Sequence, residues 1–444
     1  MRTSIKLLTV IFLYTYFSQN IFAQAPNCDA LTPGLIPLTD LGPGFFEGYQ
    51  GGLFPGGANA ENPASSHFKK GRSFAKNLQP LDSLGNINYD GGVILMGGFG
   101  PSIPGHLMDE LVPIVRDTTD DIYKTNICFD AINMSAGGKG LDYAIGSDSS
   151  KYWNNMKNKI TEKGYNILQM QVGWIYFNDK WDTAAEITFP DEPMQVADDL
   201  TTYLQLLKIY FPNIKIVFVS GRHYGGFCDT LMEQYAAISE PSSYYNNFAV
   251  KWLIERQITG DPDLRYFGIN TKVPFITWGN YFWTNGASPR ITDGRNYPCE
   301  KFSVTDGYHL TDSTNAEDAN YMMNYFYTSE FSKYYVKYGI KWAECVPYLD
   351  SIHRETDYVN ISESGFTLYP NPANEIINIY IQNETSLLSE VEIFNETGTP
   401  VHTEKSTGTF NKNLAIDIED LPAGLYFIRI KLNQAWQCKS FIKQ

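Results

Sequence analysis

The alternation of apolar runs with amphipathic segments across residues 91–331 constrains the fold of this chain most strongly. A short run of buried-strand type is followed each time by a segment with helical spacing, which is the arrangement that a parallel sheet needs for its crossovers. The runs lie at residues 93–96, 126–129, 167–172, 214–219 and 274–277, and the helical segments at about 104–115, 149–163, 194–210, 244–257 and 314–327. The pattern predicts a three-layer α/β domain with a parallel sheet.

The last part of the chain has a different period. Apolar residues alternate with polar ones at residues 376–381, 391–394, 414–418 and 425–430, and turn-forming residues separate these segments. Alternation with a period of two is typical of half-buried strands. We therefore predict an all-β sandwich over residues 366–444, joined to the α/β domain by a polar linker at residues 350–365.

The first residues have the pattern of an export signal. Arg2 and Lys6 precede an apolar run at residues 7–17, and Ala23 precedes Gln24. The apolar run is shorter than the roughly 20 residues that span a bilayer, so we predict a signal peptide at residues 1–23 and not a membrane anchor. The α/β domain is then expected at residues 24–349, with irregular structure to about residue 90.

Net charge and cysteine spacing limit the possible partners. A formal net charge of −15 argues against nucleic acid, because no basic stripe is present. The six cysteines are widely scattered and lack metal-ligand spacing, so we predict neither a bound metal nor another cofactor. No later segment is apolar enough for a transmembrane span. A metal site built from Asp306, His309 and His223 has no recognisable ligand spacing.

The segments that follow the predicted strands are rich in glycine, aromatic and polar residues. In a parallel sheet these segments meet at the carboxyl edge, where ligands bind. We assign substrate binding to Trp174, Arg222, Tyr224, Trp278, Asn280 and Trp283. Indoles stack on the apolar faces of sugar rings, but each tryptophan is equally explained as part of the core. Arg222 has two interpretations as well: it binds a carboxylate or hydroxyl of a substrate, or it pairs with Asp293.

Asp306 stands three residues before His309 in a turn that contains Gly307. A carboxylate that holds one ring nitrogen of a histidine leaves the other free to take a proton, which makes a general base. The alternative is structural: Asp306 caps a turn, and His309 is a partly buried polar residue.

The α/β region resembles the SGNH (GDSL-type) hydrolase superfamily, and within it a bacterial branch with two further motifs. These are Phe-Ala-Val-Lys-Trp-Leu-Ile at residues 248–254 and Trp-Gly-Asn-Tyr-Phe-Trp at residues 278–283. The resemblance spans residues 91–331 and implies a flavodoxin-like fold. It also implies that Asp306 and His309 form two thirds of a catalytic triad, and that Gly137 or Gly138 contributes to an oxyanion hole.

The position where the resemblance places the nucleophile holds Gly100, with Ser102 two residues later. We predict Ser102 as the nucleophile, since a serine at a helix N-terminus gains from the local positive field. A helix N-cap is the alternative role for this serine, and Ser135 is a second candidate nucleophile. The amide of Gly100 and the side chain of Asn133 are added to the predicted oxyanion hole.

The final segment resembles the C-terminal sorting domain of the type IX secretion system of Bacteroidetes bacteria. The residues that carry this resemblance are Tyr-Pro-Asn-Pro-Ala at 369–373, Asn-Glu-Thr-Gly at 395–398 and Leu-Pro-Ala-Gly-Leu-Tyr at 421–426. It implies passage through the periplasm, with that secretion machinery as partner, to release or attachment at the cell surface. Together the features predict a secreted serine esterase or deacetylase acting on a carbohydrate ester. The alternative is an inactive protein of the same fold that binds glycans.

Overall fold

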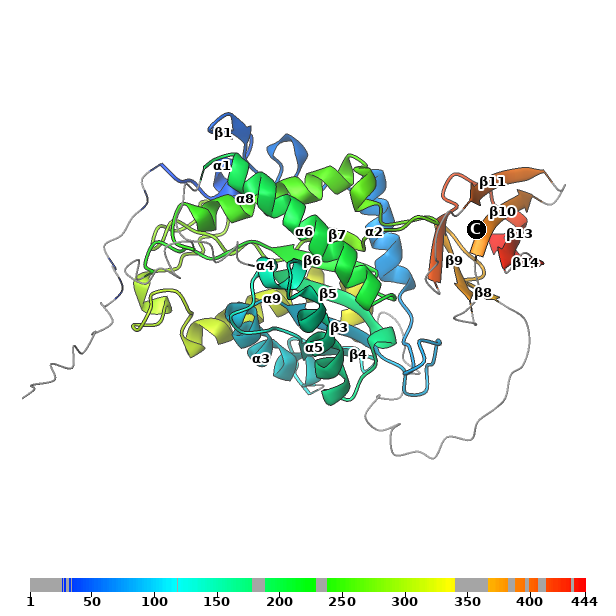
Figure 1. The fold of residues 1–444 in the computed structure, drawn as a ribbon, viewed down its shortest axis with the longest axis horizontal. Coiled ribbons are helices and arrows are strands. Elements are labelled where there is room, and N and C mark those ends of the chain that lie inside the picture. The colour runs from blue at the N-terminus through cyan, green and yellow to red at the C-terminus, as the bar shows by residue number, and fades with distance from the viewer. Residues whose placement is uncertain are drawn as a thin grey trace, which may run out of the picture.

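The computed structural model of the 444-residue chain describes residues 26, 28, 32, 34–117, 119–177, 188–228, 238–339, 366–381, 388–395, 399–405, 413–432 and 435–444. Figure 1 shows an α/β body and a smaller β domain beside it. The predicted signal peptide and linker lie outside the described residues.

The α/β body is built on a five-stranded parallel sheet with the strand order β4-β3-β5-β6-β7. The strands are β3 (Ile94–Phe99), β4 (Phe129–Asn133), β5 (Met170–Tyr176), β6 (Ile216–Ser220) and β7 (Phe275–Trp278). Every residue of β3, β5, β6 and β7 is buried, as expected for parallel strands covered on both faces. The predicted α/β class with a parallel sheet is confirmed.

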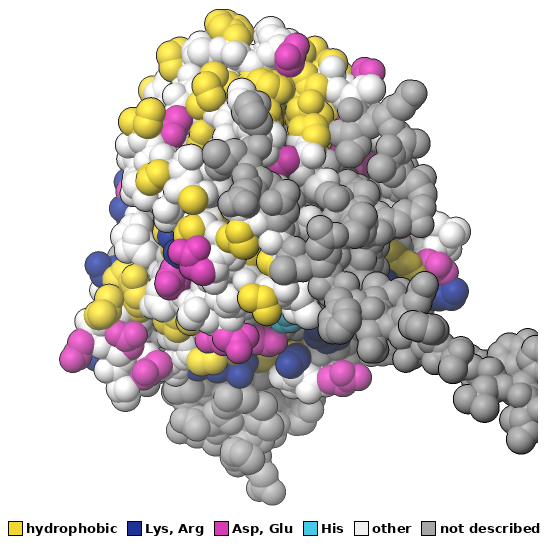
Figure 2. Space-filling model, turned by 90° about the vertical axis from the view of Figure 1, so that its left-hand side faces the viewer, with side chains coloured by type: hydrophobic (Ala, Val, Ile, Leu, Met, Phe, Trp, Pro, Cys, Tyr) yellow, Lys and Arg dark blue, Asp and Glu magenta, His cyan; other side chains and the backbone are white. Residues whose placement is uncertain are grey.

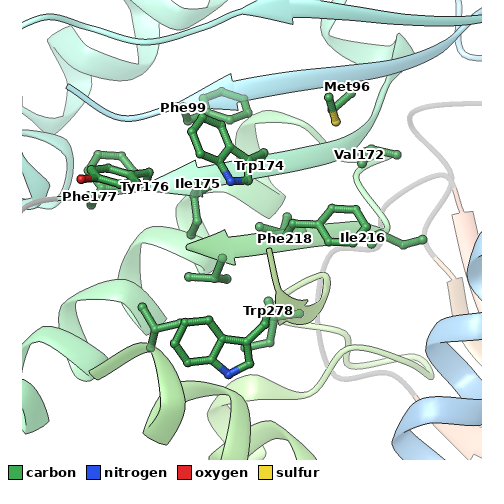
Figure 3. Packing of buried hydrophobic residues seen from close by; sticks show 14 of the residues in the cluster. Met96, Phe99, Val172, Trp174, Ile175, Tyr176, Phe177, Ile216, Phe218 and Trp278 are labelled. Carbon is green, nitrogen blue, oxygen red and sulfur yellow. The ribbon is translucent and has the colours of Figure 1, made fainter. Parts of the chain in front are cut away.

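Helices follow the strands along the chain and cover the sheet (Figure 1). They are α3 (Ser102–Arg116), α4 (Leu141–Ile145), α5 (Ser149–Glu162), α6 (Asp191–Tyr210), α8 (Ser242–Ile258), α9 (Asp312–Thr328) and α10 (Lys333–Val336). Helix α3 packs against α9, and α6 packs against α8. Figure 3 shows how large apolar side chains from neighbouring strands, among them Phe99, Trp174 and Phe218, fill the space next to the sheet.

The segment before β3 is more regular than the sequence predicts. It contains α1 (Leu38–Leu41), a hairpin of β1 (Phe45–Phe46) and β2 (Tyr49–Gln50), a 3-10 turn at Pro55–Gly57, and the helix α2 (Ser66–Asn77). The side chain of Ser65 caps α2 by accepting a hydrogen bond from the amide of Phe68 at 2.9 Å. A Cβ on Gly71 would lie 2.1 Å from the ring of Phe275, so this glycine lets α2 approach β7 closely. The prediction of irregular structure to residue 90 is therefore wrong for α2.

A disulfide connects the start of the described chain to a distant loop. Cys28 is bonded to Cys299, 271 residues later, at the start of a 3-10 turn (Cys299–Lys301). Cys128 is also disulfide-bonded, whereas Cys228 and Cys438 are free thiols. The Cys28–Cys299 bond fixes the N-terminal segment beside the loop that leads to Asp306 and His309.

The C-terminal domain consists of two antiparallel sheets with the orders β11-β10-β13-β14 and β12-β9-β8. Its strands are β8 (Phe366–Tyr369), β9 (Ile376–Ile381), β10 (Leu388–Asn395), β11 (Pro400–Lys405), β12 (Asn413–Asp417), β13 (Gly424–Leu432) and β14 (Ala435–Lys443). Inward-facing residues of both sheets share one hydrophobic cluster. The predicted all-β character is confirmed, while β8, β11 and β14 are additional to the four predicted strands.

The C-terminal domain docks beside the ends at which the strands of the parallel sheet begin (Figure 1). The Asn413 side chain donates a hydrogen bond to Asn213, ahead of β6, at 2.7 Å, and the amide of Gly268, ahead of β7, donates to the carbonyl of Ala415 at 3.1 Å. Lys70 of α2 forms an ion pair with Asp417 at 2.7 Å. This interface therefore lies at the amino edge of the sheet.

Candidate active site

The loop between β3 and α3 places Ser102 at the first position of a helix. Pro101 precedes it as the N-cap residue and provides no side-chain cap. Gly97, Gly98 and Phe99, predicted as part of this loop, belong instead to β3. These residues pair with β5, and a Cβ on Gly98 would lie 2.3 Å from the Met108 side chain, so the strand packs closely against α3 here. Ser102 therefore lies at the N-terminal, partially positive end of α3.

Ser102, His309 and Asp306 form a continuous chain of hydrogen bonds. The Oγ atom of Ser102 lies 2.7 Å from Nε2 of His309, and Nδ1 of His309 lies 2.8 Å from Oδ2 of Asp306. A carboxylate only accepts, so Nδ1 carries a proton and Nε2 is left to accept from the serine hydroxyl. The side chains of His309 and Asp306 are 26% and 15% exposed. This is the arrangement in which an imidazole can take a proton from a nucleophile.

The turn that carries Asp306 and His309 is stabilised by Asp306 itself. Its Oδ1 atom accepts hydrogen bonds from the amides of Tyr308 and His309 at 2.9 and 3.0 Å. Burial raises the pKa of the Asp306 carboxyl, but the His309 ring and these two amides more than offset it, and the net pKa lies below its usual range. Asp306 thus caps the turn and orients His309 at the same time. The two roles that the sequence offered as alternatives, turn cap and partner of the histidine, are therefore compatible.

Gly307 is required by the close packing of this turn. Its φ is +62°, and a Cβ there would lie 1.9 Å from the carbonyl oxygen of Phe227 and 2.7 Å from Pro26. The turn is therefore wedged between the loop after β6 and the N-terminal segment. The backbone bond from Ser303 to the carbonyl of His309, at 2.7 Å, closes it.

The three glycines of the predicted oxyanion hole lie in the loops that follow β3 and β4, and the loop after β3 also leads to Ser102. A Cβ on Gly100 would lie 2.0 Å from the carbonyl oxygen of Tyr176, and its φ is +141°, so only glycine fits there. Gly137 and Gly138 border open space, with nothing within 4 Å of a Cβ. Within the described residues, none of these three amides donates a hydrogen bond to another backbone group, whereas the carbonyl of Gly100 accepts one from the amide of Ala136 at 2.7 Å. The two loops are thereby held together with their amides available.

The Asn133 side chain is occupied elsewhere. Its amide group donates to the carbonyl of Gly105 at 3.0 Å and to Asp109 at 2.8 Å. Its oxygen accepts from the Ser135 hydroxyl at 2.6 Å. Both N–H bonds are used, so Asn133 joins β4 to α3 and has no donor for an oxyanion. The hydroxyl of Ser135, the second candidate nucleophile, is hydrogen-bonded to Asn133 and so belongs to the same structural network.

The side chains assigned to substrate binding are in the interior. The exposed fractions are 0% for Trp174, 2% for Trp278 and 0% for Trp283, 1% for Arg222 and Tyr224, and 2% for Asn280. Indole nitrogens donate to Ser220, to the carbonyl of Leu53 and to Glu240, respectively. The prediction that these tryptophans stack on sugars is therefore wrong. All three are part of the hydrophobic core.

The three polar members of that set also serve the scaffold. The Asn280 side chain donates to the carbonyl of Tyr321 at 3.1 Å, and the Tyr224 hydroxyl lies 3.0 Å from Thr32. The Arg222 guanidinium stacks over the Tyr308 ring at 5.2 Å from its centroid. Asp293, the alternative partner of Arg222, pairs instead with Arg290 at 2.6 Å. Arg222 therefore packs against the turn that carries Asp306 and His309.

Two polar residues, His106 and Glu240, were not predicted to be functional from the sequence. His106, on the exposed face of α3, has its ring centroid 5.7 Å from that of His309. Its position four residues after Ser102 is the signal that could have revealed it. Glu240 is buried, and burial raises the pKa of its carboxyl to about 7 although it accepts hydrogen bonds from Gly225, Trp283 and Tyr244. The buried His223 bonds to Asp318 and Tyr176, at 2.8 and 3.0 Å.

Figure 2 views the end of the molecule that lies opposite the C-terminal domain. Acidic and basic side chains are interspersed on this face, and a histidine is visible among them. Across the described ranges, no three His, Cys, Asp or Glu side chains are grouped to hold a metal ion. Likewise, none of the described helices is long and apolar enough to cross a membrane.

Comparison with known protein families explains the C-terminal domain. Residues 367–444 match the family described as a secretion system C-terminal sorting domain. The last domain is a secretion sorting domain. It implies export by the type IX secretion machinery, to the outside of the cell or to its surface. The sorting domain therefore accounts for the change of sequence period at the end of the chain.

Solved structures are similar to parts of the chain only at low identity. A DUF3244 family protein from Bacteroides vulgatus ATCC 8482, with an immunoglobulin-like β-sandwich, is 15% identical over 18% of this chain and 85% of its own, with a TM-score of 0.16. Latent PorU from Porphyromonas gingivalis is 21% identical over 18% and 9%, with a TM-score of 0.15. The acetyl xylan esterase AlAXEase is 16% identical over 52% and 98%, with a TM-score of 0.27. A search of curated proteins gave no match.

Proposed function

We propose that this protein is an exported serine ester hydrolase of the SGNH type, acting on an acyl group attached to a carbohydrate. The observation that supports it is the hydrogen-bond chain from Ser102 through His309 to Asp306, at 2.7 and 2.8 Å. These three hydrogen-bonded residues lie beyond the carboxyl ends of the parallel strands, where open sheets bind ligands. Export by the sorting domain brings this site to extracellular polymers, among which acylated polysaccharides are the ester substrates we propose.

The proposed reaction begins with attack of Ser102 Oγ on the ester carbonyl, while His309 Nε2 takes the hydroxyl proton. The tetrahedral intermediate places negative charge on the former carbonyl oxygen. Amides of Gly100, Gly137 and Gly138 and the start of α3 stabilise that charge. His309 then gives the proton to the departing alcohol, and the C–O bond breaks to leave an acyl-serine. Water, deprotonated by His309, hydrolyses the acyl-serine and restores the serine.

Asp306 keeps the imidazole in the required tautomer and stabilises the imidazolium that forms. Its lowered pKa keeps it ionised through the neutral range, so the Nδ1 proton stays on the ring. We propose no metal and no cofactor for this chemistry.

Glycan binding without turnover rested on Gly100, which stands where the resemblance places a serine. Close packing against the Tyr176 carbonyl explains why position 100 holds a glycine. Ser102 is within hydrogen-bond distance of His309 and can take the place of a serine at position 100. The indoles that would have stacked on sugars are buried. No observation favours the binding hypothesis as a second function.

The test is steady-state hydrolysis of p-nitrophenyl acetate and of acetylated xylan by the exported full chain and its variants. Ser102→Ala and His309→Ala should each lower kcat/KM by about 10³-fold or more, as loss of a triad member does. Ser135→Ala is the matched control, because Ser135 donates to Asn133, and it should stay within about threefold of the parent. Activity that survives Ser102→Ala would overturn the proposal.

A further inference from the structure

His106 is an imidazole in the active site that the proposed reaction does not use. It lies one helical turn after Ser102, so both side chains project from the same face of α3. Its ring centroid is 5.7 Å from that of His309, and the two planes are inclined by 45°. Two imidazoles of different elements therefore border the space next to the serine hydroxyl.

The position of His106 is fixed by its neighbours in the helix. Leu107 and Met108 are both fully buried, with 0% exposure, which sets the rotation of α3 about its axis. A Cβ on Gly105 would lie 2.5 Å from Ser135 Oγ, so the helix is held close to the loop after β4 at this point. Functional side chains placed on a packed helix are held more precisely than those on loops.

The ring of His106 is exposed and available. Among the residues that the structure describes, no hydrogen bond or ion pair to either of its nitrogens is found, and its one recorded contact is with the His309 ring. By contrast, the nearby Asp109 and Asn133 bond to each other at 2.8 Å. An imidazole offers a hydrogen-bond donor and an acceptor, which suits it to bind a hydroxyl group.

We propose that His106 binds the alcohol portion of the ester, through a hydroxyl group adjacent to the acylated oxygen. This inference rests on the proposed function. His309 Nε2 gives its proton to the departing alcohol, so that alcohol must lie against the His309 ring, which is the ring that His106 contacts. The glycine amides of the oxyanion hole come from the loops after β3 and β4, and Gly137 and Gly138 border open space for the acyl side. The substrate class that fits is an ester of a sugar or polyol with a free neighbouring hydroxyl.

The first test compares two esters with different alcohols. For His106→Ala, KM for an acetylated xylo-oligosaccharide should rise about fivefold to tenfold, the usual effect of losing one neutral hydrogen bond, with little change in kcat. The kcat/KM for p-nitrophenyl acetate, whose alcohol has no neighbouring hydroxyl, should stay within about twofold. His106→Gln, which keeps a donor and an acceptor, should recover part of the loss. His402→Ala, in the sorting domain, is the matched control and should have no effect.

The second test is independent of turnover. The full-length Ser102→Ala protein should bind xylotriose, the alcohol that would be released, and Ser102→Ala/His106→Ala should bind it about fivefold to tenfold more weakly by calorimetry. An equal loss on both esters would place the effect on His309 and overturn the proposal, as would unchanged KM and unchanged xylotriose binding. Turnover in the parent without any effect of His106→Ala rejects this inference alone, whereas ester turnover that survives Ser102→Ala rejects the proposed function.

Discussion

Different interactions are found at the two ends of the parallel strands, which are called here the carboxyl edge and the amino edge of the sheet. At the carboxyl edge, the start of α3 brings Ser102 to His309, and the neighbouring backbone is closely packed at Gly100 and Gly307. At the amino edge, ion pairs such as Lys70–Asp417 hold the sorting domain, and Ile269 packs into its hydrophobic cluster. The proposed catalytic residues and the sorting domain are therefore attached to opposite ends of the parallel sheet. Removing or loosening the sorting domain should leave the triad geometry intact.

The largest effect is expected where the packing at the carboxyl edge is tightest. In Gly100→Ala the new Cβ would lie 2.0 Å from the Tyr176 carbonyl, at a φ of +141° that alanine rarely adopts, so the loop holding Ser102 must move. A displacement near 1 Å costs about 100-fold in rate, and we expect kcat/KM for p-nitrophenyl acetate to fall by at least that factor. Gly424→Ala in the sorting domain, where a Cβ would meet only the Tyr426 ring at 3.8 Å, is the control and should remain within about threefold. Equal activity of the two variants would contradict the packing argument.

The disulfide supports the carboxyl edge and not the sorting domain. The Cys28→Ser/Cys299→Ser variant should lower the free energy of unfolding of the α/β domain by about 2–5 kcal/mol, because the bond closes a loop of 271 residues. Chemical denaturation followed by tryptophan fluorescence measures this. Cys438→Ser removes an exposed free thiol of the sorting domain and should change nothing. A stability loss in Cys438→Ser as large as in the double variant would contradict the assignment.

Glu240 gives the α/β domain a pH dependence that the sorting domain does not share. Burial raises the pKa of its carboxyl from 4.5 in the unfolded chain to about 7, so the folded state binds the extra proton between these values. Its contribution to stability is complete below about pH 4.5 and is lost as the pH rises toward 7, by about 3 kcal/mol in all. Unfolding free energies from pH 5 to 8 should fall more steeply in the parent than in Glu240→Gln. Parallel curves would show that Glu240 does not titrate in this range.

The smallest effect is expected at the amino edge. Asp417→Asn keeps the shape of the side chain but removes the charge that pairs with Lys70, and both partners are partly exposed. The free energy of unfolding should fall by less than about 1 kcal/mol, and kcat/KM should be unchanged within twofold. Asp420→Asn, at an exposed position, is the matched control. A large loss of esterase activity in Asp417→Asn alone would show that the two edges are coupled.

The elements of the fold were predictable where the signal is local. The predicted helix at residues 244–257 corresponds to α8 (Ser242–Ile258), and the strand at residues 376–381 matches β9. The end of β5 was not predictable, because a parallel strand buried on both faces has no alternation to mark it, and Trp174 was assigned to a loop for that reason. The strand β11 could not be predicted, because its side chains are mostly polar and exposed at a sheet edge.

The candidate site divides in the same way. Asp306 and His309 are three residues apart, so the spacing offered their pairing as one of two interpretations, and the resemblance favoured it. The contact of His309 with Ser102 joins residues 207 positions apart, and it required the resemblance to a known superfamily. The burial of Trp278 and Trp283 depends on contacts with Leu53 and Glu240, which no local pattern encodes. His106 is marked in the sequence only by its position four residues after Ser102, one helical turn along α3.

The most direct test of the central claim is covalent labelling of the full-length protein with a fluorophosphonate, followed by peptide mapping. An activated serine displaces fluoride from phosphorus and keeps the phosphonyl group on Oγ. We expect the adduct on Ser102 in the parent and in Ser135→Ala, and no adduct in His309→Ala, because the base is absent. An adduct on Ser135 or another serine, or labelling of Ser102 that persists without His309, would contradict the account.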